Sequence, residues 1–288
     1  MELENVKKIC VVGAGNMGHQ ISLKAAIAGF KVTCTDVSSE TLEKAKKFTE
    51  LYLSERIKKG ELGEVEVENI VKNIDFMTSL DDAAKDVDFV IEAATENLEV
   101  KRALFERLDI VCKDDAILAT NSSFIVSSKL AGSTKRPDKV INMHFFNPAL
   151  VMKLVEVVKG PHVSNKTCET TMGIARKMDK IPVKLKKEIR GFVVNRILDA
   201  INNEALFLLD QDIASFEDID IAVENGLRHP MGPFKLMDLM GIDLAYLIAM
   251  GIYKETLDQS EKPSPIVAGK FALGEWGRKT GKGFYKYD

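Results

Sequence analysis

The chain has 288 residues, of which 45% are hydrophobic and 29% are charged, and its formal net charge at pH 7 is −3. This length and composition predict a globular protein with one large domain or two ordinary ones. The near balance of acidic and basic residues excludes an overall basic footprint for nucleic acid or for an anionic membrane, so we expect neither as a partner.

The first segment, residues 7–36, has the pattern of a single βαβ unit. A short apolar run ends in the stretch GAGNMG (residues 13–18), and the helical periodicity that follows stops at Gly29. The run KVTCTD (residues 31–36) then reads as a second strand. The unit is therefore about 30 residues long, which is the usual size of a dinucleotide-binding βαβ motif.

Strands and helices continue to alternate as far as about residue 188. A long polar helical pattern covers residues 38–60, and the later apolar runs NIDFMTS, VDFVIEAA and AILATNSS read as strands. The stretch NLEVKRALFERLDIVC reads as an amphipathic helix between two of them. This alternation predicts a mostly parallel, doubly wound sheet over residues 1–188, which is an α/β fold.

Two neighbouring runs late in this segment break the parallel pattern. KVINMHFF and KLVEVVKG are separated only by a short link that contains proline, and such a link cannot make a parallel crossover. We therefore expect an antiparallel pair of strands, followed by a helix at about 165–179 and a strand at IPVKLKK.

The sequence pattern changes near residue 190, where helical periodicity replaces the alternation of strands and helices. We predict a second, all-helical domain over residues 189–288. Its first helix, GFVVNRILDAINNEALFLLDQ, is apolar on most faces, so we expect it to be buried within its domain or in a subunit interface.

The chain has four cysteines, and none of them shows metal-ligand spacing. Buried free thiols in a reducing compartment are the simplest interpretation. The N-terminus is acidic and leads directly into a strand, and no apolar run approaches the roughly 20 residues that span a bilayer. We therefore expect no metal and a cytoplasmic location, with the matrix of an organelle as the alternative.

The glycines at positions 13, 15 and 18 form the motif G-x-G-x-x-G in its confirming context, between a strand and a helix. The whole loop, with Ala14, Asn16 and Met17, is the predicted cofactor-binding segment. Asp36 ends the second strand, where a carboxylate can accept hydrogen bonds from both ribose hydroxyls and repels a 2′-phosphate. The pattern predicts NAD, with NADP less favoured.

A dinucleotide oxidoreductase also needs a group that takes or gives the substrate's hydroxyl proton, and histidine suits that task near neutral pH. The chain has four: His19, His144, His162 and His229. His19 follows the glycine loop, His162 is expected in a solvated turn, and His229 lies in a loop of the helical domain. His144 ends a strand at the edge where α/β folds bind ligands, so it is the leading candidate.

Glu156 strengthens the case for His144. A carboxylate between valines is costly unless it is paired, and the predicted hairpin makes the two residues cross-strand neighbours. Glu156 would then fix the tautomer of His144 and stabilise its imidazolium, although a buried pair that only holds the hairpin is the alternative. Ser122, at a strand end, and Asn195, in a helix, could each donate to a substrate oxygen or be ordinary turn and helix residues.

These motifs together resemble the short-chain L-3-hydroxyacyl-CoA dehydrogenases, including the 3-hydroxybutyryl-CoA dehydrogenases of bacteria. The resemblance covers nearly the whole chain, through VVGAGNMG, EAATENLEVKRALFERLD, NSS, HFFNPALVMKLVEVV, GFVVNRIL, HPMGPFKLMDLMGID and GRKTGKGFYKYD. It implies reversible, NAD-dependent oxidation of an L-3-hydroxyacyl-CoA to the 3-ketoacyl-CoA. It also implies a Rossmann-type domain with a helical hairpin at about 38–72, and a helical domain that forms a homodimer.

The resemblance also implies roles for individual residues. His144 and Glu156 match the acid–base pair, and Ser122 and Asn195 match the residues that bind the substrate's 3-oxygen. The other implied contacts are Glu96 and Lys101 near the nicotinamide ribose, Asn147 and Lys279 at the cofactor, and Lys58 or Lys59 at the CoA nucleotide.

One departure is Arg190, which stands where the family usually has proline before the glycine of GFVVNR. The turn between the domains loses a fixed φ and gains a charge. Two other functions stay open at this point: a 3-hydroxyacid dehydrogenase that acts on a free acid or sugar acid, and a non-catalytic relative of the crystallin-like or NAD-sensing kind.

Overall fold

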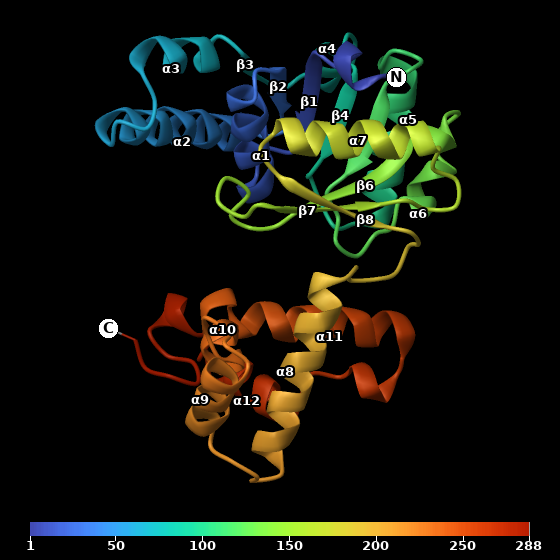
Figure 1. The fold of residues 1–288 in the computed structure, drawn as a ribbon. Coiled ribbons are helices and arrows are strands. Elements are labelled where there is room, and N and C mark those ends of the chain that lie inside the picture. The colour runs from blue at the N-terminus through green and yellow to red at the C-terminus, as the bar shows by residue number, and fades with distance from the viewer. Residues whose placement is uncertain (288) are drawn as a thin grey trace. The chain divides into compact units, whose positions relative to one another are not determined.

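The computed structural model describes residues 1–287, which form two compact units, Met1–Phe192 and a second one that begins at Val193. The division falls slightly after the predicted boundary between residues 188 and 189. The helix–strand alternation lies in unit 1, and unit 2 is built of helices, as the change of sequence pattern indicates (Figure 1). Each unit is described by itself below.

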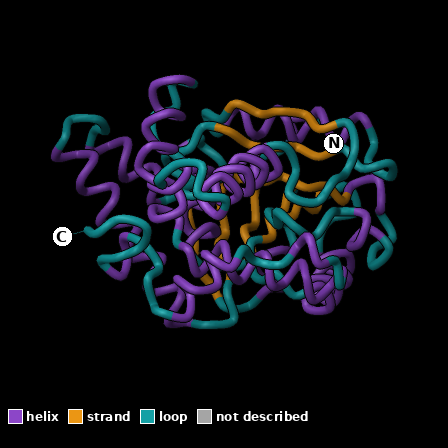
Figure 2. Tube along the Cα trace, turned by 90° about the horizontal axis from the view of Figure 1, so that it is seen from below, coloured by secondary structure: helices purple, strands orange, loops and turns teal. Residues whose placement is uncertain are grey.

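Unit 1 contains one eight-stranded sheet with the order β3-β2-β1-β4-β5-β6-β7-β8. All neighbouring strands are parallel except β6 and β7, so the predicted mostly parallel sheet and its one antiparallel pair are confirmed. Figure 2 shows the strands in orange, with helices around them. The strands are β1 Lys8–Val12, β2 Lys31–Thr35, β3 Ile74–Met77, β4 Phe89–Glu92, β5 Ile117–Thr120, β6 Val140–Phe145, β7 Leu154–Val158 and β8 Ile181–Leu185.

Helices cover both faces of this sheet, because successive side chains of each strand point to opposite faces. In β1, Ile9 and Val11 join one buried cluster with residues of α1 and α7, whereas Cys10 and Val12 join another with residues of α4 and α5. This is the doubly wound arrangement that the sequence predicts. The helices of unit 1 are α1 Asn16–Ile27, α2 Ser39–Lys58, α3 Glu64–Val71, α4 Leu80–Ala84, α5 Leu98–Val111, α6 Ser128–Ala131 and α7 Asn165–Lys177.

The helices α2 and α3 form the predicted hairpin between β2 and β3 (Figure 1). Ser38 begins α2 by accepting a hydrogen bond from the backbone N–H of Thr41, which satisfies one of the unpaired donors of the first turn. The helix buries four side chains, Leu42, Ala45, Thr49 and Leu53, and most of its other residues are polar, although Leu51 is 58% exposed. The helix α2 therefore packs against the rest of unit 1 through a narrow apolar stripe.

Unit 2 packs its helices around a small aromatic and aliphatic core that includes Phe234, Ile242 and Phe284. Two buried carboxylates fasten its C-terminal tail. Asp238 accepts hydrogen bonds from the backbone N–H groups of Phe284 and Tyr285, and Asp220 accepts one from the Tyr285 hydroxyl. The helices of this unit are α8 Val194–Asp210, α9 Phe216–Gly226, α10 Pro233–Met240, α11 Ile242–Thr256 and α12 Pro265–Ala272.

Helix α8 is not buried within its own unit. Only Ala205 and Leu206 are buried along it, and Ile197 and Phe207 are more than half exposed in the single chain. The first predicted alternative, that its own domain buries α8, was therefore wrong for most of this helix. A cover supplied by a second subunit is the alternative that stays open.

All four cysteines are buried free thiols, as predicted. Within residues 1–287 no group of three or more His, Cys, Asp or Glu side chains is placed to hold a metal ion. In the same residues no single helix is long and apolar enough to cross a bilayer, and only α10 and α11 taken together reach that length, with a bend of 87° between them.

Candidate active site

The candidate site lies at the edge of the sheet where the parallel strands end. β1, β4, β5 and β6 are parallel neighbours, so the segments that follow them leave the sheet at one edge. These segments carry the glycine loop, Glu96, Ser122 and Asn147 in that order. Open α/β sheets bind their ligands at this edge, and the topology therefore gathers residues that are distant in the sequence.

The glycine loop has no room for side chains at two of its three glycines. A Cβ on Gly13 would lie 2.6 Å from the Cα of Ala94, and one on Gly18 would lie 1.7 Å from the carbonyl oxygen of Gly13. Gly13 also has a φ of 96°, which favours glycine. A Cβ on Gly15 would meet nothing within 4 Å, so the space above this residue is open where helix α1 begins. An open, side-chain-free helix N-terminus fits the pyrophosphate of a dinucleotide.

Asp36 accepts two backbone hydrogen bonds, one of them from the glycine loop. Its carboxylate accepts one from the backbone N–H of Ala14 at 2.8 Å and one from that of Ser38 at 2.9 Å. The side chain is only half-buried, so it can still accept from a ligand. Its negative charge suits the two hydroxyls of the NAD ribose and opposes a 2′-phosphate.

A hydrogen-bonded link joins the glycine loop to the turn after β6. The side chain of Asn16 donates to the Asn147 side-chain oxygen at 3.1 Å. Buried Gln20 supports both segments, because it donates to Asn16 at 3.1 Å and accepts from the Leu150 N–H at 3.3 Å. The fold thus brings together two predicted cofactor residues, and the sequence reasoning missed Gln20. Its signal is a polar residue on the buried side of α1.

His144 and Glu156 lie directly opposite each other in the antiparallel pair β6–β7. Nδ1 of His144 is 3.0 Å from Oε2 of Glu156, and their side chains are 9% and 1% exposed. The predicted cross-strand contact is therefore confirmed. A carboxylate at Nδ1 keeps a proton on that nitrogen, so Nε2 carries the lone pair that can accept a proton.

The hydroxyl of Ser122 is already hydrogen-bonded within the protein. It donates to Glu96 at 2.5 Å and accepts from the backbone N–H of Ile125 at 2.8 Å, and the residue is 2% exposed. The next residue, Ser123, is half-buried, and its hydroxyl makes no hydrogen bond to any other part of residues 1–287. The two adjacent serines thus differ in the availability of their hydroxyls, a difference that the sequence NSS does not reveal.

Lys101 is buried beneath this loop and forms an ion pair with Glu92 at 2.5 Å. Glu92, at the end of β4, also accepts from the Thr120 hydroxyl at 2.7 Å and from the Ala94 N–H at 2.8 Å. A buried carboxylate requires such partners. The pair therefore joins α5, β4 and β5 directly under the segment that carries Glu96.

The remaining candidates lie apart from this cluster or in the other unit. Lys58 is the last residue of α2 and Lys59 follows it, and both are exposed. In unit 2, Asn195 lies in the first turn of α8, and Lys279 donates to Asp243 at 2.5 Å.

The other histidines of unit 1 have structural partners. Nδ1 of His19 is 2.7 Å from the carbonyl oxygen of Gly15, and burial lowers the pKa of this imidazole. His162 is half-buried, with Nε2 at 3.0 Å from the Val140 carbonyl oxygen, so the prediction of a solvated side chain was wrong. His144 is thus the unit 1 histidine paired with a carboxylate at the sheet edge.

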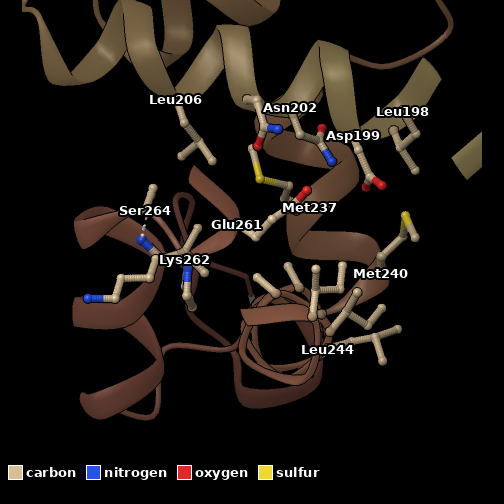
Figure 3. A pocket seen from close by; sticks show the side chains of 18 of the residues that line it. Leu198, Asp199, Asn202, Leu206, Met237, Met240, Leu244, Glu261, Lys262 and Ser264 are labelled. Atoms are coloured by element: carbon tan, nitrogen blue, oxygen red, sulfur yellow. Dashed lines mark hydrogen bonds between the residues drawn. The ribbon is translucent and has the colours of Figure 1, made fainter. Parts of the chain in front are cut away.

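Unit 2 contains a separate pocket of about 160 Å³, shown in Figure 3. Its wall is mostly apolar and includes Leu206, Met237 and Leu244, and Asp199 and Glu261 lie at its polar side. Burial, and then the negative charge of Glu261, raise the pKa of Asp199. Among the described residues no histidine lines this pocket.

A dinucleotide cradle and a histidine–carboxylate pair at one sheet edge define an NAD-dependent dehydrogenase. Comparison with protein families agrees. The model of the 3-hydroxyacyl-CoA dehydrogenase NAD-binding domain matches residues 8–189, and the model of the C-terminal domain of the same enzymes matches residues 191–287. The chain belongs to the 3-hydroxyacyl-CoA dehydrogenase family, and it is an oxidoreductase that uses NAD.

Individual relatives match over almost their full lengths. A 3-hydroxybutyryl-CoA dehydrogenase of Clostridioides difficile is 39% identical over 281 residues, which cover 98% of this chain and 99% of the relative. The mitochondrial hydroxyacyl-coenzyme A dehydrogenase of Sus scrofa is 39% identical over 98% of this chain and 91% of its own. The crystal structure of (S)-3-hydroxybutyryl-CoA dehydrogenase from Ralstonia eutropha is 37% identical with a TM-score of 0.91, and covers 99% of this chain and 100% of its own.

Proposed function

We propose that the protein catalyses the reversible oxidation of a short-chain L-3-hydroxyacyl-CoA, such as 3-hydroxybutyryl-CoA, to the 3-ketoacyl-CoA, and that His144 is its acid–base group. The observation that carries the proposal is the buried pair of His144 and Glu156 beside a cofactor cradle. The names of the relatives from Clostridioides difficile and Ralstonia eutropha support the short acyl chain.

In the oxidation direction, Nε2 of His144 takes the proton of the substrate's 3-hydroxyl. Glu156 accepts the hydrogen bond from Nδ1 and stabilises the positive charge that develops on the ring. NAD, when bound, supplies the hydride acceptor for C3. The open helix N-terminus at Gly15 and the carboxylate of Asp36 would hold its pyrophosphate and ribose.

Other residues of the cluster orient the cofactor. Glu96 and Asn147 are exposed at the sheet edge, where their side chains can reach a nicotinamide ribose. The ammonium of Lys101 is bound to both oxygens of buried Glu92, so we assign it a supporting role under the Glu96 segment. Lys279, and Lys58 or Lys59, stay predicted contacts of the cofactor and of the CoA nucleotide.

The substrate's 3-oxygen needs hydrogen-bond donors besides His144. We propose Ser123 for this role in place of Ser122, and Asn195 stays a predicted contact of the same oxygen. The Ser122 hydroxyl already donates to Glu96, whereas no residue of the described chain engages that of Ser123. Ser123→Ala should lower kcat by about tenfold or more with little change in NADH affinity. If Ser123→Ala is fully active and Ser122→Ala alone is impaired, the assignment returns to Ser122.

The function is tested by a spectrophotometric assay with NADH and either acetoacetyl-CoA or free acetoacetate. We expect turnover of the thioester and little of the free acid. His144→Ala should lower kcat by at least ~10²-fold while NADH still binds. Preference for the free acid would favour the 3-hydroxyacid dehydrogenase alternative, and no turnover of either would favour a non-catalytic relative. An active His144→Ala variant would refute the mechanism.

We also propose that unit 2 mediates a homodimer. Helices α8 and α11 expose apolar side chains in the single chain, among them Phe207, Leu244 and Leu247. Exposed apolar surface of this kind is typical of subunit interfaces. Leu247→Glu should shift the mass measured by light scattering toward the monomer. Val65→Glu, on exposed α3, is the matched control and should leave the mass unchanged.

A further inference from the structure

Two phenylalanine rings pack beside the imidazole of His144. The ring centroid of Phe146 lies 4.6 Å from that of His144, and the centroid of Phe192 lies 5.4 Å away, with interplanar angles of 58° and 57°. Phe146 follows β6 directly, so its place is a consequence of the strand. Phe192 is instead the last residue of unit 1 and reaches His144 from the connection to unit 2. It is fully buried.

The backbone of Phe192 is unusual for a bulky residue. Its φ is 52°, in the left-handed region that side chains other than glycine seldom adopt, and Gly191 before it has a φ of 73°. Such a conformation persists only where surrounding contacts determine it. Here the Gly191 N–H donates to the Ser123 carbonyl oxygen at 3.3 Å, and the Phe192 ring packs in a buried cluster with Val158 and Leu185.

A second anchor fastens the same connection to the loop after β5. Glu188 accepts hydrogen bonds from the Ser127 hydroxyl at 2.9 Å and from the Ser128 N–H at 2.8 Å. A Cβ on Gly160 would lie 2.7 Å from the Glu188 carboxylate, so a larger residue there would require the Glu188 side chain to shift. Hydrogen bonds therefore hold the connection at Glu188 and at Gly191. They place the Phe192 ring in its apolar cluster and against the His144 imidazole.

The hydrogen bond to Glu156 alone does not fix the imidazole. It holds Nδ1, but the χ2 torsion of histidine has a broad energy well, so the ring can swing about that contact and carry Nε2 away from the substrate. Packed rings beside the imidazole remove this freedom. Proton transfer requires Nε2 to remain within hydrogen-bond reach of the reacting oxygen, and a displacement of about 1 Å can cost ~10² in rate.

We propose that Phe192 is a positioning residue for His144, which holds the imidazole plane so that Nε2 faces the substrate while Nδ1 stays on Glu156. The proposal rests on the proposed acid–base role of His144. It explains why a buried aromatic side chain occupies a left-handed position at the end of unit 1. It also makes the connection between the units part of the catalytic apparatus of unit 1.

The test compares three variants of the full-length protein. Phe192→Leu keeps an apolar side chain but removes the ring, and Phe192→Gly keeps the left-handed backbone without any side chain. Phe30→Leu is the matched control, because Phe30 is also fully buried but precedes β2, at the opposite edge of the sheet. For each we would measure the melting temperature, kcat, the KM values for NADH and acetoacetyl-CoA, and the NMR resonances of the His144 ring.

We expect Phe192→Leu to lower kcat by about 10- to 100-fold, to leave the KM for NADH within about twofold, and to broaden or shift the His144 ring signals. Phe192→Gly should lose at least as much kcat. Phe30→Leu should lower the melting temperature but keep kcat and the His144 signals, because it is remote from the site.

Parent-like kcat and His144 signals in Phe192→Leu would overturn the proposal. So would an active Phe192→Gly variant, because the backbone turn and not the ring would then be what matters. If Phe192→Gly does not fold, Phe192→Leu and the NMR signals still decide. His144→Ala separates this failure from that of the proposed function. An inactive His144→Ala with a parent-like Phe192→Leu refutes only the positioning role, whereas an active His144→Ala refutes the acid–base role itself.

Discussion

Replacing Glu156 with glutamine removes one charge and keeps the size of the side chain, so it measures how much the carboxylate stabilises the imidazolium of His144. The two groups are almost excluded from water, with side-chain exposures of 1% and 9%, and the hydrogen-bonded atoms are 3.0 Å apart. Unit charges about 4 Å apart interact by about 4 kcal/mol at an effective dielectric constant of about 20.

This energy sets the expected loss of activity. If the positive charge is about half developed in the transition state, its loss costs about 2 kcal/mol, or about 30-fold in kcat, and a fully developed charge costs about 10³-fold. The glutamine amide can also donate to Nδ1 and stabilise the wrong tautomer, which would add to the loss. We therefore expect kcat in the Glu156→Gln variant to fall by about 30- to 1000-fold.

The pH profile supplies a second readout. The variant removes the anion beside the imidazole, so the acidic limb of the kcat/KM profile should move if the carboxylate acts in catalysis. The assay is NADH oxidation with acetoacetyl-CoA over a range of pH. Glu169→Gln is the control, because Glu169 is an exposed residue of α7 paired with Lys184, and kcat should stay within about twofold. A kcat within about threefold of the parent and an unmoved acidic limb would mean that the buried pair only holds the hairpin.

Two further predictions follow from the glycine loop and from a buried carboxylate. Gly18→Ala would place a Cβ 1.7 Å from the Gly13 carbonyl oxygen, so NADH affinity in a fluorescence titration should fall by at least ~10-fold; Gly132→Ala, in open space, is the control, and equal affinities would contradict the cradle. The Asp88→Asn variant tests how the lowered pKa of this carboxylate contributes to the pH dependence of folding stability. Burial alone would raise the pKa of Asp88, but hydrogen bonds from Lys113 and two backbone N–H groups outweigh it and the pKa lies below its ordinary value. The carboxylate therefore contributes stability that is present above about pH 4 and lost as the pH falls through its folded pKa. The variant should lose about 1–3 kcal/mol in urea unfolding at neutral pH and progressively less in acid, and a loss that does not change with pH would refute this account.

The main features of the site could be predicted because they depend on local patterns. G-x-G-x-x-G between a strand and a helix leaves few alternatives to a dinucleotide cradle, and Asp36 follows at the end of the next strand. The link between His144 and Glu156 is too short for a crossover, so an antiparallel pair was required, and the structure places the two residues in register.

Other features could not be predicted because their partners are distant in the sequence. Periodicity does not say which of two adjacent serines turns inward, and the contact of Ser122 with Glu96 decides this. The apolar pattern of α8 indicated a covered helix but not what covers it. The resemblance implies a cofactor contact for Lys101, and the ion pair of its ammonium with buried Glu92 is visible only in the fold.

The sequence by itself determined the sheet-and-helix order, the cradle and the pairing of His144 with Glu156, because these follow from spacing along one stretch of chain. Only the tertiary structure decided how that pair is held. Phe192 lies far from His144 in the sequence, and its left-handed backbone and burial arise from contacts with three other segments. Long-range packing of this kind has no signature in local periodicity, because the packed side chains come from segments that are distant in the sequence.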